Sequence, residues 1–260
     1  MVEKLEGKLF VFDLDDTLID NVHDYAQPIL DATRLIVEEL GSRAPHVTKI
    51  VNLEQEIDSR RVKEINPATG SPFLFSMNRF PGSLAKVYEH IFLTAGVVPR
   101  IEIGAKLFLI GLTAFDEKRY GKNIKPGVKE VLNFIAENNG VSVLLSKGDR
   151  GVQAKKIIAL ENAGIAAADF AEIIVVENKS SKDFAEIRKL RQHRICFSVG
   201  NSYESDIVPA LEAGYKGILI PVETWEVIGK MDEILAKVDK EKCFVFGNLF
   251  EIKEKWEELA

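Results

Sequence analysis

The sequence contains few cysteine, histidine, methionine and tryptophan residues. Its 260 residues include 2 cysteines, 4 histidines, 3 methionines and 2 tryptophans. Cys196 and Cys243 each lie in an apolar, strand-like run, so we expect buried thiols rather than a disulfide. Abundant lysine and glutamate beside scarce histidine, methionine and glutamine are typical of thermophilic proteins.

Long apolar runs and dense basic runs are also missing. The longest apolar candidate, residues 101–115, is too short to span a bilayer and contains Glu102 and Lys106. The charged amino terminus enters the first strand directly, which leaves no room for a signal peptide. A formal net charge of -6 argues against a nucleic-acid surface. We therefore expect a cytoplasmic protein, monomeric or homodimeric, that binds neither membranes nor nucleic acid.

What is present is the composition of a globular protein, with 46% hydrophobic and 28% charged residues. Apolar, strand-like runs alternate with helix-like segments from about residue 125 onward. We expect strands at residues 8–12, 141–146, 172–176, 195–200, 217–221 and 243–247, and helices at 128–138, 152–162, 183–192 and 207–213. Continuous apolar strands that alternate with helices predict a Rossmann-like α/β fold with a parallel sheet covered on both faces.

Residues 21–124 interrupt this alternation. They are mainly helical in pattern, with helices expected at 25–40, 52–64 and 84–95 and a loop-rich stretch at 66–83. Such an insertion is far too long for an ordinary crossover. We predict two domains: an α/β core of residues 1–20 and 125–260, and a helical domain of residues 21–124 above the carboxyl end of the first strand.

The first strand ends in a crowd of acids. Residues 8–12 are apolar, and Asp13, Asp15 and Asp16 follow at once. Asp13 and Asp15 are two residues apart, so their side chains point to the same side of an extended chain. Like charges on one side destabilise each other unless a cation lies between them. The pattern therefore indicates a cation-binding or catalytic site rather than a solvated turn.

Polar residues also follow three other expected strands. Ser146 and Lys147 end the second, Lys179 follows the third, and Asn201 and Asp206 follow the fourth. Ligands of parallel sheets bind beyond the carboxyl ends of the strands, so we expect these residues to gather near Asp13 and Asp15.

The stretches FDLDDTL, LLSKGDR, the lysine of ENKSSKDF and VGNSYESD, in this order, resemble the motifs of the haloacid dehalogenase (HAD) superfamily, most of whose members are magnesium-dependent phosphatases. The large helical insertion after the first motif is similar to the cap of the subgroup called C1. The resemblance implies a phosphomonoesterase that acts on a small phosphorylated metabolite.

The resemblance also implies roles that agree with the chemistry of the residues. Asp13 is the expected nucleophile, since aspartate can form an aspartyl-phosphate. Asp15 is the expected acid and base for the leaving oxygen and the attacking water. Relatives that displace halide lack this second aspartate. Ser146, Lys147 and Lys179 are expected to bind the phosphoryl group, with Ser146 and Lys179 also catalytic.

Mg²⁺ is the expected cofactor, held by Asp13, the Asp15 carbonyl, Asn201 and Asp206. Many relatives read GDSxxxD where this chain reads GNSYESD, so Asn201 removes one negative charge and Asp206 is the stronger candidate ligand. Lys182 is an alternative to Lys179. We prefer Lys179 because it stands five residues before Phe184, and the resemblance to the superfamily implies this spacing of lysine and aromatic residue.

Alternatives to a phosphatase are a phosphomutase with the same intermediate and a catalytically idle binding module.

In the insertion, Arg79 lies in an expected loop where its guanidinium could hold a carboxylate or phosphate of the substrate. Phe73, Phe75 and Phe80 are expected to pack, and residues 101–115 are expected to form the core of the insertion.

Overall fold

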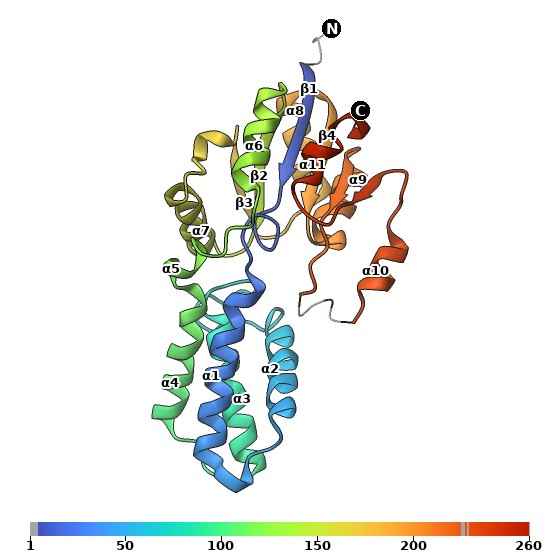
Figure 1. Cartoon of the computed structure of the whole chain (residues 1–260). Helices are drawn as coiled ribbons and strands as arrows, with labels where there is room; N and C mark the ends of the chain where they lie inside the picture. Colours follow the sequence, from blue (N-terminus) through green and yellow to red (C-terminus); the bar gives the residue numbers. More distant parts are fainter. Residues whose placement is uncertain (1–4, 225–226, 228, 260) are drawn as a thin grey trace. The chain divides into compact units, whose positions relative to one another are not determined.

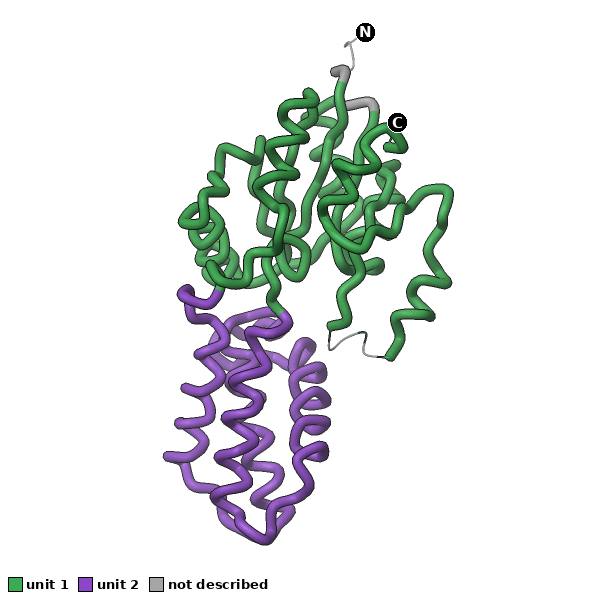
Figure 2. Tube along the Cα trace, viewed as in Figure 1, with its two compact units in different colours: residues 1–21, 120–260 green, residues 22–119 purple. Residues whose placement is uncertain are grey.

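The computed structural model describes residues 5–224, 227 and 229–259, and its chain forms two compact units (Figures 1 and 2). The first comprises residues 1–21 and 120–260, and the second comprises residues 22–119. These boundaries lie within a few residues of the two expected domains.

The first unit is built on a six-stranded parallel sheet in the order β3-β2-β1-β4-β5-β6. The strands are β1 (Leu5–Phe12), β2 (Val141–Lys147), β3 (Ile173–Val176), β4 (His193–Gly200), β5 (Lys216–Leu219) and β6 (Cys243–Val245). All the expected strands form because each is a short apolar run that both faces of a parallel sheet can bury. The expected Rossmann-like α/β fold is confirmed.

The helices of the first unit lie between these strands, except α11, which follows β6. They are α6 (Val128–Glu137), α7 (Arg150–Asn162), α8 (Ser181–Arg191), α9 (Val208–Glu212), α10 (Met231–Lys237) and α11 (Glu251–Glu254), with 3₁₀ turns at Ala167–Asp169 and Trp256–Leu259. The start of one helix differs from the sequence-based expectation. The segment before α9 is a π-helical turn, η4 (Tyr203–Ile207), which shortens the α-helix expected at 207–213.

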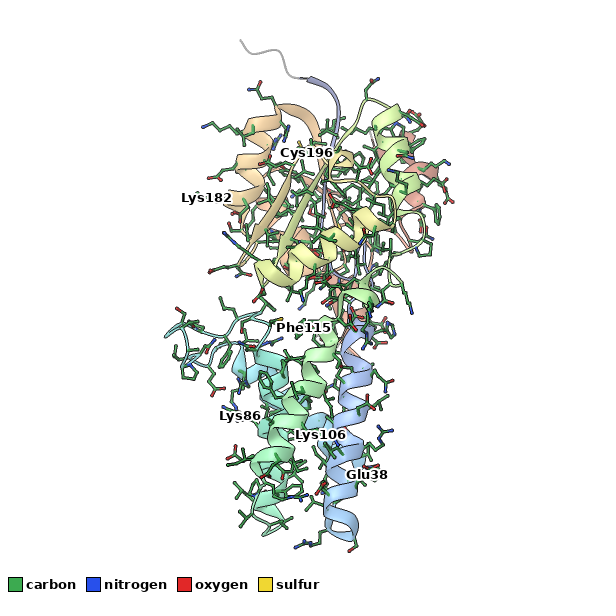
Figure 3. The ribbon with its side chains drawn as sticks, turned by 90° about the vertical axis from the view of Figure 1, so that its left-hand side faces the viewer. Glu38, Lys86, Lys106, Phe115, Lys182 and Cys196 are labelled. Atoms are coloured by element: carbon green, nitrogen blue, oxygen red, sulfur yellow. The ribbon has the colours of Figure 1, made fainter. Side chains whose placement is uncertain are left out.

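The second unit is helical, as expected, but its helices begin earlier than the sequence pattern predicted. They are α1 (Val22–Leu40), α2 (Val47–Arg61), α3 (Arg79–Thr94), α4 (Ile101–Leu112) and α5 (Glu117–Tyr120), with 3₁₀ turns at Gly41–Arg43 and Thr113–Phe115. The last residue of α5, Tyr120, already belongs to the first unit. Figure 3 shows Glu38, Lys86 and Lys106 on α1, α3 and α4. Aromatic packing joins the helices. The ring of Tyr25 packs edge-on against the rings of Phe80 and Phe115, with centroid distances of 4.8 and 6.1 Å.

Residues 101–115 contribute less to the core of this unit than expected. Leu107 and Phe115 are buried, but Ile101 is 88% exposed and Leu109 is 63% exposed. A single stripe of α4 therefore packs against its neighbours, although most residues of the helix are apolar.

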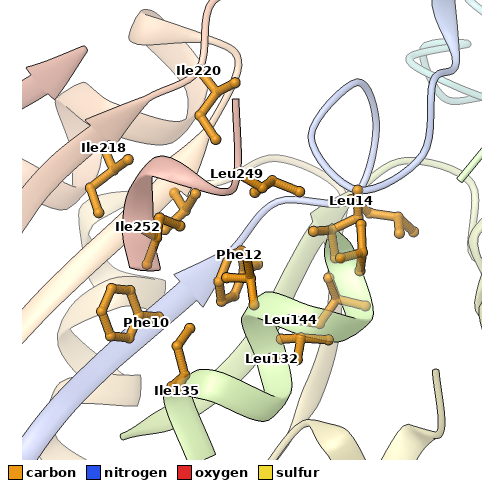
Figure 4. Close-up of a cluster of buried hydrophobic side chains, with 14 of the residues drawn as sticks. Phe10, Phe12, Leu14, Leu132, Ile135, Leu144, Ile218, Ile220, Leu249 and Ile252 are labelled. Carbon is orange, nitrogen blue, oxygen red and sulfur yellow. The ribbon is translucent and has the colours of Figure 1, made fainter. Parts of the chain in front are cut away.

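The alternation of side chains along β1 links the hydrophobic core to the acids that follow it. Phe10 and Phe12 face one side of the sheet, in a buried cluster with residues of α6 and α11 (Figure 4). Leu9 and Val11 face the other side, with Phe184 of α8. Because both faces of β1 are covered from Leu9 to Phe12, Asp13 emerges from the buried end of the strand at the carboxyl edge of the sheet.

Candidate active site

The site begins where β1 leaves the sheet. The amide of Asp13 donates to the carbonyl of Val199 in β4 (2.9 Å), which continues the pairing of the two strands by one residue. The chain then turns tightly: the amide of Asp16 donates to the carbonyl of Ile19 (2.7 Å), and Asp16 has φ 60°. Aspartate is one of the few residues that tolerate this left-handed conformation. The turn holds the backbone around Asp15 in place.

A buried lysine joins the first and fourth motifs. The Nζ of Lys179 donates to Oδ1 of Asp13 (2.5 Å) and to Oδ1 of Asp206 (2.7 Å). All three side chains are less than a tenth exposed. Lys179 immediately precedes Ser180, the N-cap of α8. The side chains of Ser180 and Asp183 together cap this helix.

Charge in this cluster is not balanced. Burial raises the pKa of Asp13 to about 7; the Lys179 ammonium opposes this shift, and the carboxylates of Asp206 and Asp15 add to it. Burial by itself would lower the pKa of Lys179, but Asp13 and Asp206 raise that pKa to about 12. Lys179 therefore stays charged, whereas burial and the neighbouring carboxylates favour a proton or a further cation on Asp13.

Asp206 is held by the backbone of its own motif. Its Oδ2 accepts from the amide of Ser202 (2.9 Å), and its carbonyl accepts from the Oγ of Ser198 (2.8 Å). A Cβ on Gly200 would lie 2.3 Å from this Oδ2, so only glycine leaves room for the carboxylate. Among the described residues, the side-chain amide of Asn201 makes no hydrogen bond, so its oxygen is available to a ligand.

The residues present fit a magnesium ion. Magnesium takes oxygen ligands and retains several waters. The site offers the carboxylates of Asp13 and Asp206, the carbonyl of Asp15 and the amide oxygen of Asn201, and a cation would ease the ionisation of Asp13, which burial and the nearby carboxylates oppose. Within the described ranges no cluster of three or more His, Cys, Asp or Glu residues has the geometry of a metal site.

Ser146 lies fully buried in β2, and its Oγ has no hydrogen-bond partner among the described residues. A buried hydroxyl without a partner is costly unless a ligand satisfies it. Lys147 is half-buried, and its carbonyl accepts from Nε2 of Gln153 (3.1 Å). The amide of Gly148 donates to Val176, so it is not free to bind the phosphoryl group.

The rival lysine lies elsewhere. The Lys182 side chain is 82% exposed and pairs with Glu186 at 3.9 Å, one turn along α8 (Figure 3). Lys179, rather than Lys182, is the lysine that contacts Asp13 and Asp206.

Arg79 is not in a loop, and that expectation was wrong. It is the first residue of α3, and its guanidinium is buried against Asp58 of α2 at 3.0 Å. Helix α3 begins there, before Pro81 and Gly82, because a proline is well tolerated in the first turn of a helix. With its charge already paired, Arg79 is a weaker candidate for binding a substrate than the sequence indicated; that role stays a prediction.

Sequence reasoning missed two residues that contact Asp15. Gln153 and Lys156 of α7 both donate to its carboxylate, Gln153 at 2.8 Å. The Lys156 side chain is 2% exposed. Their spacing of three residues places them on one face of a helix, but nothing in the sequence shows that this face meets Asp15.

Comparison with known proteins decides the family. A family model described as haloacid dehalogenase-like hydrolase matches residues 8–214. The chain belongs to the haloacid dehalogenase-like hydrolases. This span contains each of the strand-end residues described above.

Solved structures of HAD-like hydrolases share the fold at low sequence identity. A haloacid dehalogenase-like family hydrolase from Xanthomonas campestris is 19% identical, with a TM-score of 0.67 over 97% of this chain and 96% of that one. A predicted phosphoglycolate phosphatase from Haemophilus somnus 129PT is 16% identical, with a TM-score of 0.56 over 96% and 98%. A 2-haloacid dehalogenase from Pseudomonas syringae pv. tomato DC3000 is 22% identical, with a TM-score of 0.51 over 98% and 100%.

The search of curated proteins finds no match. In the described part of the chain, no helix combines the length and the apolar content that crossing a membrane requires.

Proposed function

We propose that this HAD-like hydrolase is a magnesium-dependent phosphomonoesterase that acts on a small phosphorylated metabolite. One observation carries the proposal: a second carboxyl group, that of Asp15, follows Asp13 by two residues and is held in place by hydrogen bonds from Gln153 and Lys156. A halide leaves as a stable anion and needs no proton, whereas the oxygen of a phosphate ester leaves far more readily when it is protonated. A second carboxyl group beside the nucleophile is therefore useful for phosphate esters and idle in halide displacement.

The residues divide the reaction into two displacements. In the first, an Asp13 oxygen forms a bond to phosphorus, the ester P–O bond breaks, and the leaving oxygen takes a proton from Asp15. In the second, a water loses a proton to Asp15 and attacks phosphorus, which breaks the bond to Asp13 and releases phosphate. Lys179 holds the Asp13 carboxylate in place, and the Ser146 hydroxyl is available to a phosphoryl oxygen.

Asp13, the Asp15 carbonyl, Asn201 and Asp206 would hold the magnesium ion, whose charge would offset that of the phosphoryl group. The ion would also relieve the repulsion among the buried carboxylates. The helical unit, residues 22–119, would serve as a cap of the C1 type. The enzyme would work in the cytoplasm as a monomer or homodimer, without nucleic acid or membrane.

A screen of phosphorylated metabolites with Mg²⁺, parallel to a screen of 2-haloacids, tests the proposal. We expect phosphate release from one group of related metabolites and no halide release. The Asp13→Asn variant is the control for contaminating phosphatases. Halide release without phosphate release would show a dehalogenase, transfer to a second hydroxyl would show a mutase, and inactivity in both screens would favour a binding module.

A further inference from the structure

The carboxylate of Asp15 is held from one side by helix α7. Its Oδ2 accepts from Nε2 of Gln153 (2.8 Å), and its Oδ1 accepts a short hydrogen bond from Nζ of Lys156. Both oxygens thus have a donor from the same helix, at positions 153 and 156 on one face. Two donors to two oxygens fix the rotation of a carboxylate as well as its position.

Lys156 is a costly residue to bury, which makes its placement informative. Its side chain is 2% exposed, its ion pair is with Asp15, and Nζ also donates to Oδ1 of Asn21 (2.7 Å). The ammonium lies 5.3 Å from the centre of the Tyr120 ring. Taking an ammonium out of water costs several kcal/mol unless its partners replace the water. Here the partners are Asp15, the Asn21 amide and an aromatic face, all within the first unit.

The position of Gln153 is equally specific. Its Nε2 donates to Asp15 and to the carbonyl of Lys147 (3.1 Å), so it ties the end of β2 to the loop after β1. A Cβ on Gly148 would lie 2.9 Å from this nitrogen, and Gly148 has φ 139°. Glycine at this position therefore suits both the backbone conformation and the space that Gln153 occupies.

We propose that Lys156, assisted by Gln153, is a positioning residue that holds the Asp15 carboxyl group where it transfers the proton. The inference rests on the proposed function, because it concerns the proton that Asp15 gives to the leaving oxygen. A carboxyl group that turns freely spends less time aligned with that oxygen, and misalignment slows proton transfer. Lys156 acts through Asp15 and does not itself take part in the bonds that form or break.

This role predicts a dependence on the leaving group. An ester with a good leaving group, such as 4-nitrophenyl phosphate, needs little help from a proton, whereas phenyl phosphate and alkyl phosphates need more. We expect Lys156→Met to lower kcat/KM for an alkyl phosphate by about a hundredfold and for 4-nitrophenyl phosphate by less than about tenfold. Lys156→Arg keeps the charge and a donor, so it should recover part of the loss. Gln153→Leu should show the same trend more weakly.

Lys155→Met is the matched control, since it removes the same charge from the adjacent position of α7. It should leave kcat/KM unchanged for every ester. The double variant Asp15→Asn/Lys156→Met guards against a folding defect, because it removes both members of the pair and leaves no unpaired charge. In the Asp15→Asn background, Lys156→Met should have no further effect on any ester.

The outcomes separate this inference from the proposed function. If the wild-type chain hydrolyses the esters but Lys156→Met slows all of them equally, the positioning role is wrong and Lys156 is only structural. A full effect of Lys156→Met in the Asp15→Asn background would also overturn it, since the lysine would then act independently of Asp15. If the wild-type chain hydrolyses no phosphate ester, the proposed function fails and the inference fails with it.

Discussion

Glu54→Gln is expected to stabilise the helical unit at alkaline pH and to have little effect at acid pH. Glu54 lies in α2 and is 5% exposed. Burial raises its pKa from 4.5 to about 8; Asp58 adds to this shift, and Arg79 opposes it. The folded protein therefore keeps a proton on Glu54 that the unfolded chain has already lost near neutral pH.

The sign and size of the effect follow from this shift. Below the unfolded pKa, Glu54 is protonated in both states, and its contribution to stability is independent of pH. As pH rises from 4.5 to about 8, the unfolded chain ionises and the folded unit resists, so stability falls; above that range the loss is constant. A shift of this size corresponds to at most roughly 5 kcal/mol, so we expect a loss of a few kcal/mol. Glutamine does not titrate and therefore shows no such loss.

Denaturant unfolding at several pH values, combined with hydrogen–deuterium exchange of α2 and α3 peptides, measures this difference within the helical unit. The Glu54→Gln variant should gain stability relative to the wild type as pH rises from about 5 to about 9, because only the wild type has to ionise a buried Glu54 in this range. Glu56→Gln, at an exposed position of the same helix, is the control. A difference between Glu54→Gln and wild type that does not vary with pH would refute the reasoning.

Three other predictions concern residues of the two units. Lys179→Met should lower kcat at least about a hundredfold, because the buried carboxylates of Asp13 and Asp206 lose their shared cation. The control, Lys182→Met at an exposed position, should leave kcat within about twofold of the wild type. Equal losses of kcat in the two variants would mean that Lys179 has no special role. Asp206→Ala should raise the Mg²⁺ concentration needed for half activity more than Asn201→Ala does, since a carboxylate binds the ion more strongly than an amide; equal activation curves would contradict this ranking. Arg79→Ala should destabilise the helical unit by ~3–5 kcal/mol in denaturant unfolding, because buried Asp58 loses its ion-pair partner and keeps the Ser83 hydroxyl as a donor, whereas Arg60→Ala, an exposed control, should cost under ~1 kcal/mol. Binding of substrate by Arg79 would further require a larger loss of kcat/KM for the natural substrate than for an aryl phosphate.

The strands of the core could be predicted because their signal is local. The residues from Leu9 to Phe12 are apolar on both faces, and the neighbouring central strands are mostly apolar, so burial and strand structure follow from the sequence itself. The order of motifs at the strand ends then placed Asp13, Lys179 and Asp206 in one region, because parallel strands share one carboxyl edge. The hydrogen bonds of Lys179 to both carboxylates agree with that placement.

The helical unit was harder to predict because its local signals are ambiguous. Arg79 precedes Phe80, Pro81 and Gly82, a stretch that is typical of a loop, yet packing of Phe80 against Tyr25 and pairing of Arg79 with Asp58 start α3 there. These contacts depend on α1 and α2, which are distant in the sequence.

The partners of Asp15 show the same limit inside the core. Lys155 and Lys156 are adjacent lysines in a helix, and nothing in the sequence distinguishes them. Only the packing of α7 buries Lys156 against Asp15 while Lys155 stays half-buried. A residue's charge can be read from the sequence, but the partner that makes its burial tolerable depends on the tertiary fold.

The central claim is that Asp13 attacks phosphorus. A rapid-quench reaction with a phosphomonoester and Mg²⁺, in water enriched in heavy oxygen, tests it most directly. Borohydride reduction of the quenched chain, followed by mass spectrometry of its peptides, locates any acyl-phosphate. We predict that Asp13 carries the phosphoryl group and that the heavy oxygen appears in the released phosphate. Heavy oxygen incorporated into the Asp13 carboxylate would show that water attacks the acyl carbon of Asp13 rather than phosphorus, which would contradict the account. The absence of any modified Asp13 during turnover would equally contradict it.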